Sequence, residues 1–143
     1  MNVNSTETRT VVVEREIAHP PEKIWRALTQ PMLIEEWLMK NDFELVIGHR
    51  FNLRGDWGGV LDCEVLSVET NRRLAYTWNF AHEDDAYNLQ SVVTLTLTPT
   101  DKGTHLRMEQ AGFRPTQKQA FHGANYGWQE NLAKLEGVLD RMT

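Results

Sequence analysis

The last quarter of the chain constrains the fold most, because its apolar residues recur at helical spacing from Lys118 to Met142. A repeat of three and four residues is typical of an amphipathic helix that lies on a core. The apolar positions of this repeat are Phe121, Ala124, Trp128, Leu132, Leu135 and Leu139. The sequence therefore predicts one long C-terminal helix that packs against another layer of structure.

The first half of this helix differs from the second half because Gly123 and Gly127 interrupt it between aromatic residues. A glycine inside a helix costs roughly 1 kcal/mol relative to alanine, so two of them one turn apart need a reason. Either another backbone approaches closely there, or space is left for something else. A long helix over a curved sheet, with room under one end, is one way to form a small-molecule cavity.

The rest of the chain reads as one strand, two short helices and about six further strands. Thr10–Ile17 is β-branched and predicts a strand, and proline starts two helical segments at Glu22–Leu28 and after Pro31. The predicted strands that follow are Glu44–Val46, Arg50–Arg54, Gly59–Glu69, Leu74–Phe80, Asn88–Thr98 and Thr104–Gly112. The short links between them favour an antiparallel meander, and hence an α+β fold.

Alternation along the strands predicts which side chains face the long helix. The inward set is Leu74, Tyr76, Trp78, Phe80, Leu89, Ser91, Val93, Leu95, Leu97, Leu106, Met108 and Gln110. Two of these, Ser91 and Gln110, are polar, and a buried polar side chain requires a protein, water or ligand partner. The strand at 59–69 is apolar on both faces, so alternation does not orient it.

Length and charge limit the classes of function. A chain of 143 residues is expected to form one domain, here residues 10–143, after a polar, flexible tail at residues 1–9. The net charge of −5 argues against nucleic-acid and anionic-membrane partners. A single cysteine, Cys63, and a tail without a signal-peptide pattern favour the cytoplasm.

Several short segments, taken in order, carry a family resemblance. They are Ala18–Thr29, Ile34–Leu38, Glu64–Glu69, Arg73–Trp78, Gly103–Leu106, Gln110–Phe113 and Gly127–Trp128, with Leu132 and Leu135 after them. In this order they resemble the START-like superfamily, also called Bet v 1-like or SRPBCC, and within it the branch related to the activator of heat-shock protein 90 ATPase. The resemblance spans about Thr10 to Met142. It implies a helix-grip fold, in which a curved antiparallel sheet wraps around a long C-terminal helix.

The resemblance does not imply one activity, because relatives include lipid carriers, hormone receptors, polyketide cyclases and co-chaperones. The residues themselves predict no metal site and no cofactor: the five histidines show no paired ligand spacing, and one cysteine cannot form a thiolate site. They also show no nucleophile motif, so no catalytic residue is assigned. The predicted cavity lining is Tyr76, Trp78, Ser91, Val93, Met108, Gln110, Phe113, Phe121, His122, Asn125 and Trp128.

Four functional hypotheses follow from these residues. The first is a non-enzymatic domain that holds a small apolar or aromatic molecule between sheet and helix. The second is a cyclase- or hydrolase-like enzyme that uses His122 with Gln110 or Tyr76, which requires His122 to point inward. The third is a co-chaperone-like protein that acts through its surface. The fourth is a core filled by its own aromatic side chains. A homodimer that covers the second apolar face of strand 59–69 is a further alternative.

Overall fold

The computed structural model describes residues 7–142 of the chain and has ten secondary-structure elements. The three helices are α1 (Pro21–Thr29), α2 (Pro31–Trp37) and α3 (Lys118–Arg141). The seven strands are β1 (Arg9–Ile17), β2 (Lys40–Asn41), β3 (Arg50–Arg54), β4 (Val60–Glu69), β5 (Arg73–Phe80), β6 (Leu89–Thr100) and β7 (Gly103–Phe113). This order confirms the predicted α+β helix-grip fold.

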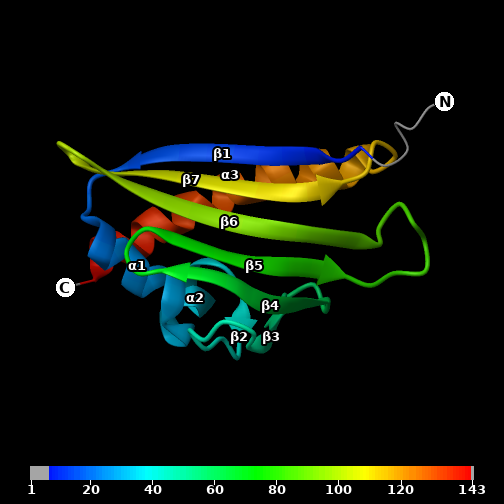
Figure 1. Cartoon of the computed structure of the whole chain (residues 1–143), viewed down its shortest axis with the longest axis horizontal. Coiled ribbons are helices and arrows are strands. Elements are labelled where there is room, and N and C mark those ends of the chain that lie inside the picture. Colours follow the sequence, from blue (N-terminus) through cyan, green and yellow to red (C-terminus); the bar gives the residue numbers. More distant parts are fainter. Residues whose placement is uncertain (1–6, 143) are drawn as a thin grey trace.

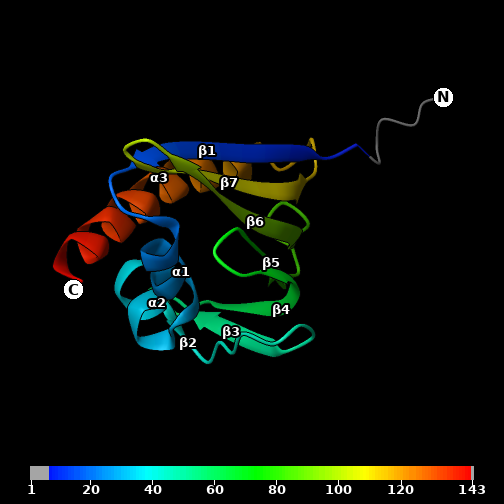
Figure 2. The ribbon, with the colours of Figure 1, turned by 60° about the vertical axis from the view of Figure 1, so that its left-hand side comes forward.

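All seven strands form one sheet in the order β1-β7-β6-β5-β4-β3-β2, and every neighbouring pair is antiparallel. The first strand therefore pairs with the last one, as Figure 1 shows. From β3 to β7 each strand follows its neighbour through a short connection, which confirms the meander. In Figure 2 the sheet curls, and all three helices lie on its concave side.

The two short helices form a corner at one end of the sheet. Each has a proline at its first helical position, where the missing N–H costs nothing. The indole Nε1–H of Trp37 donates to the carbonyl of Ala27 at 2.9 Å, which ties α2 to α1. Trp37 is also buried, so this corner forms a rigid surface against which the end of α3 packs.

One predicted strand, Glu44–Val46, is wrong. The strand on the outer edge of β3 is instead β2, where Lys40 and Asn41 lie opposite Arg54 and Leu53. Residues 44–49 form turns instead, and Gly48 has a φ of +90°, which only glycine adopts readily. The apolar side chains of this segment are exposed, so their strand propensity has no buried face to act on.

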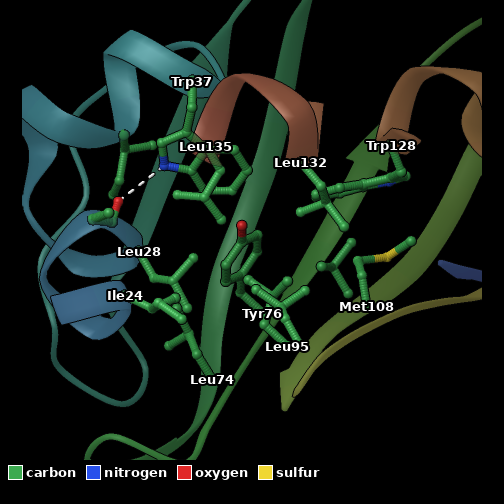
Figure 3. Close-up of a cluster of buried hydrophobic side chains, with 14 of the residues drawn as sticks. Ile24, Leu28, Trp37, Leu74, Tyr76, Leu95, Met108, Trp128, Leu132 and Leu135 are labelled. Atoms are coloured by element: carbon green, nitrogen blue, oxygen red, sulfur yellow. Dashed lines mark hydrogen bonds between the residues drawn. The ribbon is translucent and has the colours of Figure 1, made fainter. Parts of the chain in front are cut away.

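The core lies between the inner face of the sheet and the helices (Figure 3). The inward residues of β5, β6 and β7 predicted from alternation are buried, apart from Phe80 and Leu89, which are partly buried. In β4 the buried face is Leu61, Cys63 and Val65, and a register shift after Val65 leaves Leu66 exposed. Among the described residues, no helix is long and apolar enough to cross a membrane.

Candidate functional site

A cavity of about 220 Å³ lies where the first half of α3 passes over β5, β6 and β7. Its walls come from α3, from the inner face of the sheet and from the segment after α2. The lining residues are Met39, Trp78, Leu89, Gln110, Phe113, Ala120, Gly123, Ala124, Gly127, Trp128 and Asn131. Most of them are apolar, with one buried amide, which is the usual make-up of a small-molecule site.

The two glycines of α3 both line this cavity. A Cβ atom added at Gly123 or at Gly127 would meet no atom within 4 Å outside the helix's own backbone. Close approach of another backbone therefore does not explain either glycine. Both glycines border open space, Gly127 at a partly buried position and Gly123 at an exposed one.

A chain of hydrogen bonds connects the polar residues behind the cavity. The indole Nε1–H of Trp128 donates to Oε1 of Gln110 at 2.8 Å. The Gln110 amide in turn donates from Nε2 to Oγ of Ser91 at 3.1 Å. The Ser91 hydroxyl donates to the carbonyl oxygen of Trp78 at 2.6 Å. Both predicted buried polar residues thus have protein partners, which fix the Gln110 amide at the cavity wall.

Gln110 still has hydrogen-bonding capacity to spare. A glutamine amide offers two N–H donors and two acceptor lone pairs, and the chain described above uses one of each. The residue is only 1% exposed, and no other partner for its side chain exists within residues 7–142. One donor and one acceptor of Gln110, a residue that lines the cavity, therefore have no protein partner among the described residues.

Two aromatic side chains form the rigid part of the wall. The rings of Trp78 and Trp128 lie 5.3 Å apart between centroids, and Trp37 extends the cluster at 6.4 Å from Trp128. At the other end, Phe113 closes the cavity and contacts Phe121 edge-to-face at 5.7 Å. Tilted and edge-to-face arrangements are favoured for aromatic pairs, so these contacts help to fix the rings in the wall.

Five of the eleven residues predicted to line the cavity lie at it or next to it. Trp78, Gln110, Phe113 and Trp128 belong to its wall, and Ser91 lies directly behind Gln110. The remaining six are elsewhere: Tyr76, Val93 and Met108 are buried in the core, Phe121 and His122 line a different cavity, and Asn125 lies on the partly exposed surface of α3.

The positions of these six residues have simple causes. Val93 and Met108 lie on the inward face, but neither side chain has any exposed surface. His122 is exposed, and its ring packs edge-to-face on Phe121. Asn125 turns outward and accepts a hydrogen bond from the side chain of Gln129 at 2.7 Å. Helical spacing places His122 beside the apolar stripe, and only the packing of α3 shows that it lies on the side of the helix away from this cavity.

Tyr76 lies among Phe43, Phe51 and the helices rather than at the cavity. The centroid of its ring lies 5.3 Å from that of Phe51 and 6.4 Å from that of Phe43. Figure 3 shows its hydroxyl directed toward α3. Burial raises the pKa of this hydroxyl, so Tyr76 stays protonated. No hydrogen-bond partner for it occurs among the described residues.

Sequence reasoning missed several wall residues. Alternation predicts an inward Leu89 without placing it in the cavity, Ala124 is predicted only as part of the helical stripe, and the two glycines are predicted as a possible source of space but are absent from the predicted lining. Met39 carries no sequence signal, because it follows the end of α2 and reaches the cavity only through the corner formed by the short helices.

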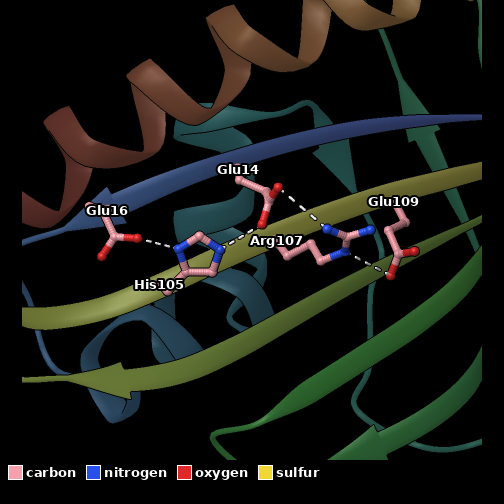
Figure 4. Close-up of polar contacts among 5 residues, drawn as sticks. All are labelled: Glu14, Glu16, His105, Arg107 and Glu109. Carbon is pink, nitrogen blue, oxygen red and sulfur yellow. Dashed lines mark hydrogen bonds and ion pairs between the residues drawn. The ribbon is translucent and has the colours of Figure 1, made fainter.

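A second polar cluster lies on the outer face of the sheet, away from the cavity (Figure 4). His105 lies between Glu16 and Glu14, with its Nε2 at 2.7 Å from Glu14. Arg107 continues the cluster to Glu14 at 3.3 Å and to Glu109 at 3.6 Å.

Hydrogen bonding to Glu16 and Glu14 raises the pKa of His105, and the bond from His105 lowers the pKa of Glu14. All five groups are partly exposed, which is typical of a surface ion-pair network. No group of three histidine, cysteine or acidic residues suited to a metal ion is found in the described part of the chain.

Comparisons with known proteins agree with this architecture. The family model described as activator of Hsp90 ATPase homolog 1-like protein matches residues 18–140. The solved structure of MLL2253 from Mesorhizobium loti is similar at 69% sequence identity, with a TM-score of 0.92 over 94% of this chain and 99% of that one. No curated protein matches the chain significantly.

Two further solved structures share the fold. CalU16 from Micromonospora echinospora is 25% identical with a TM-score of 0.76, over 94% of this chain and 78% of that one. DynU16, a protein of the dynemicin biosynthetic locus, is 22% identical with a TM-score of 0.81, over 92% of this chain and 47% of its own length. At this identity DynU16 shows likeness of fold alone.

Proposed function

Because the chain belongs to the activator of Hsp90 ATPase homolog 1-like family, within the START-like superfamily, we propose that it is a small-molecule binding domain. The ligand is a small apolar or aromatic molecule held between α3 and the sheet. A cavity of about 220 Å³ accommodates a molecule of one or two fused rings, since an engineered cavity of about 150 Å³ binds benzene.

The observation that carries this proposal is the pair of glycines over empty space. Gly123 and Gly127 lie inside a long helix, where alanine would be more stable by roughly 1 kcal/mol each. Nothing within 4 Å would obstruct the alanine methyl group at either position. With glycine at these positions the helix is less stable than it would be with alanine, although alanine would fit. Room for a ligand in the cavity that both glycines line accounts for this loss of stability.

Gln110 indicates what kind of ligand the cavity prefers. Its fixed amide leaves one donor and one acceptor available beside the rings of Trp78 and Trp128. An aromatic molecule with a single hydroxyl or ring N–H would stack on the indoles and satisfy the amide. A purely apolar ring would bind less tightly, because it would leave the buried amide unpaired.

The enzyme alternative has less support from the geometry. It needs His122 within reach of a bound substrate, but this side chain is exposed on the side of α3 away from the cavity. Tyr76, its suggested partner, is buried among aromatic rings. The co-chaperone alternative rests on the family name, and no particular surface of this chain supports it. The homodimer and the cytoplasmic location remain predictions.

Ligand titrations of paired glycine variants test the proposal. We expect 1-naphthol to bind the wild-type protein saturably, followed by tryptophan fluorescence and by isothermal calorimetry. Naphthalene should bind about two- to tenfold more weakly, because it makes no hydrogen bond to Gln110. Gly127→Leu should lose binding of both molecules, because the larger side chain grows from the cavity wall into the space.

Gly127→Ala is the matched control. It should keep 1-naphthol binding and raise the free energy of unfolding by up to about 1 kcal/mol, since the methyl group meets nothing and alanine favours the helix. Gly123→Leu repeats the test if Gly127→Leu does not fold. Unchanged naphthol affinity in a folded leucine variant, or no saturable binding to the wild type, would contradict the proposal. Native mass spectrometry of protein from its own host would then identify the natural ligand class.

A further inference from the structure

A second cavity, of about 230 Å³, lies at the other side of the start of α3 and shares no lining residue with the first. Four of its lining residues carry basic side chains. Arg9 comes from the start of β1, Arg114 from the segment after β7, and Lys118 and His122 from the first turns of α3. We propose that this cavity binds a small anion, a phosphate or carboxylate group carried by an organic molecule.

The first argument is uncompensated charge. No acidic residue lines the cavity, although the protein as a whole has a net charge of −5. Within residues 7–142, Arg9, Lys118 and His122 form no ion pair, and neither does Glu7, the acidic residue nearest to Arg9 in the sequence. Three permanent cations and a histidine therefore meet without a counter-charge, an arrangement that an anion would stabilise.

The second argument is that Arg114 is held in place without being neutralised. Its Nη2 donates to the backbone carbonyls of Asp85 at 2.7 Å and Asn88 at 3.2 Å. Gln117 reinforces this arrangement: its Nε2 donates to the same carbonyls at 2.9 and 2.8 Å, and its Oε1 accepts from the Arg114 backbone N–H at 2.9 Å. Gln117 is only 2% exposed, so this support is a fixed part of the fold.

Backbone carbonyls leave the guanidinium positively charged, with its remaining N–H groups free of protein partners among the described residues. A guanidinium oriented in advance binds a phosphate or carboxylate with two parallel hydrogen bonds at a lower entropic cost. The acidic segment Glu83–Asp85 lies nearby, but it reaches Arg114 through a main-chain oxygen, and no carboxylate of this segment forms an ion pair with the cluster in the described structure.

The third argument concerns the organic part of the ligand. Phe121 lines the cavity together with the cations, and its ring is held between Phe113 and His122, each with a centroid separation of 5.7 Å. An apolar or aromatic group attached to the anion would pack on this ring, while the charged group meets Arg114 and Lys118. A phosphate or carboxylate with an aromatic substituent fits both parts of the cavity.

The test is a titration followed by NMR chemical shifts of the backbone amides, with inorganic phosphate, phenyl phosphate and neutral phenol as probes. We expect saturable shifts centred on residues 114–118 with both phosphates, weaker at higher ionic strength, and no shift there with phenol, which carries no charge and whose ring and hydroxyl suit the first cavity. Tighter binding of phenyl phosphate identifies an organic anion as the ligand. Equal affinity for the two phosphates identifies the free anion and overturns the proposed organic part.

Two double variants with the same loss of positive charge distinguish binding at this cavity from a general attraction of anions to surface charge. Arg9→Gln/Lys118→Gln should weaken phosphate binding by about two- to fivefold for each lost charge. Lys40→Gln/Lys102→Gln removes the same total charge far from the cavity and should leave the affinity unchanged. Neither pair of side chains holds the fold together, since within residues 7–142 none of the four forms an ion pair. Equal weakening by the two double variants, or shifts that never saturate, would overturn the proposal.

Discussion

The two halves of α3 are built on the same stripe of residues but do different things. From Trp128 onward the stripe is packed completely: Leu132, Leu135 and Leu139 have no exposed surface. Before Trp128 the same positions hold Phe121 and Ala124, which are only partly buried, and the glycines face empty space. One half anchors the helix to the sheet, and the other spans a cavity.

The difference shows that the apolar stripe of a helix indicates which side faces the core, but not how tightly that side is packed. The C-terminal half faces the corner made by α1 and α2, which fills the space between helix and sheet. The N-terminal half passes over the open end of the curved sheet, where the described structure has no second helix layer to fill the gap. Substitutions in the two halves should therefore have unequal effects.

The largest expected effect is the loss of packing in the second half. Leu132→Ala should lower the free energy of unfolding by about 2–5 kcal/mol, because it removes a fully buried side chain and leaves a void. Phe121→Ala, in the first half, should cost clearly less because its side chain is already partly exposed and borders open space. Urea denaturation of both variants measures the contrast, and equal losses would show that the first half is packed as tightly as the second.

The next effect concerns Trp128, which lies where the two halves meet. Trp128→Phe removes the donor to Gln110 and should cost about 1–3 kcal/mol, since the buried Oε1 loses its partner. Replacing both residues, as Gln110→Leu/Trp128→Phe, should cost less than the sum of the single changes, because no orphaned amide remains. Additive losses in denaturation experiments would mean that this hydrogen bond does not link helix and sheet.

The smallest effect belongs to neither half of α3 but to the outer face of the sheet. Because the pKa of His105 is raised in the folded protein, its contribution to stability is complete below the unfolded pKa of about 6.5 and is lost as pH rises through the folded value. The pKa of Glu14 is lowered, so its contribution is present above the unfolded pKa of about 4.3 and is lost as pH falls through the folded value.

Consequently, wild-type protein should exceed His105→Gln in stability most between these limits, and the difference should shrink on both sides. The effect should be small and sensitive to salt, because the cluster is exposed. Thermal unfolding as a function of pH measures it. A difference that persists well above neutral pH would show that His105 acts through packing and not through charge.

Most of the fold could be read from the sequence because the patterns that encode it are local. Period-two alternation in β5, β6 and β7 and the helical repeat of α3 each identify a buried face without reference to the rest of the chain. The prediction of a strand at Glu44–Val46 was wrong for the corresponding reason: its residues favour a strand, but tertiary structure offers them no inner face.

The sequence by itself determined the elements, their order and the presence of two glycines that needed an explanation. Only the tertiary structure decided what the glycines face, because open space is set by how far α3 lies from the sheet and not by any residue's own propensity. It also decided that His122 points outward and that Met39 reaches the cavity. A helical rotation and a loop's path depend on contacts between segments distant in sequence, and no local pattern records them.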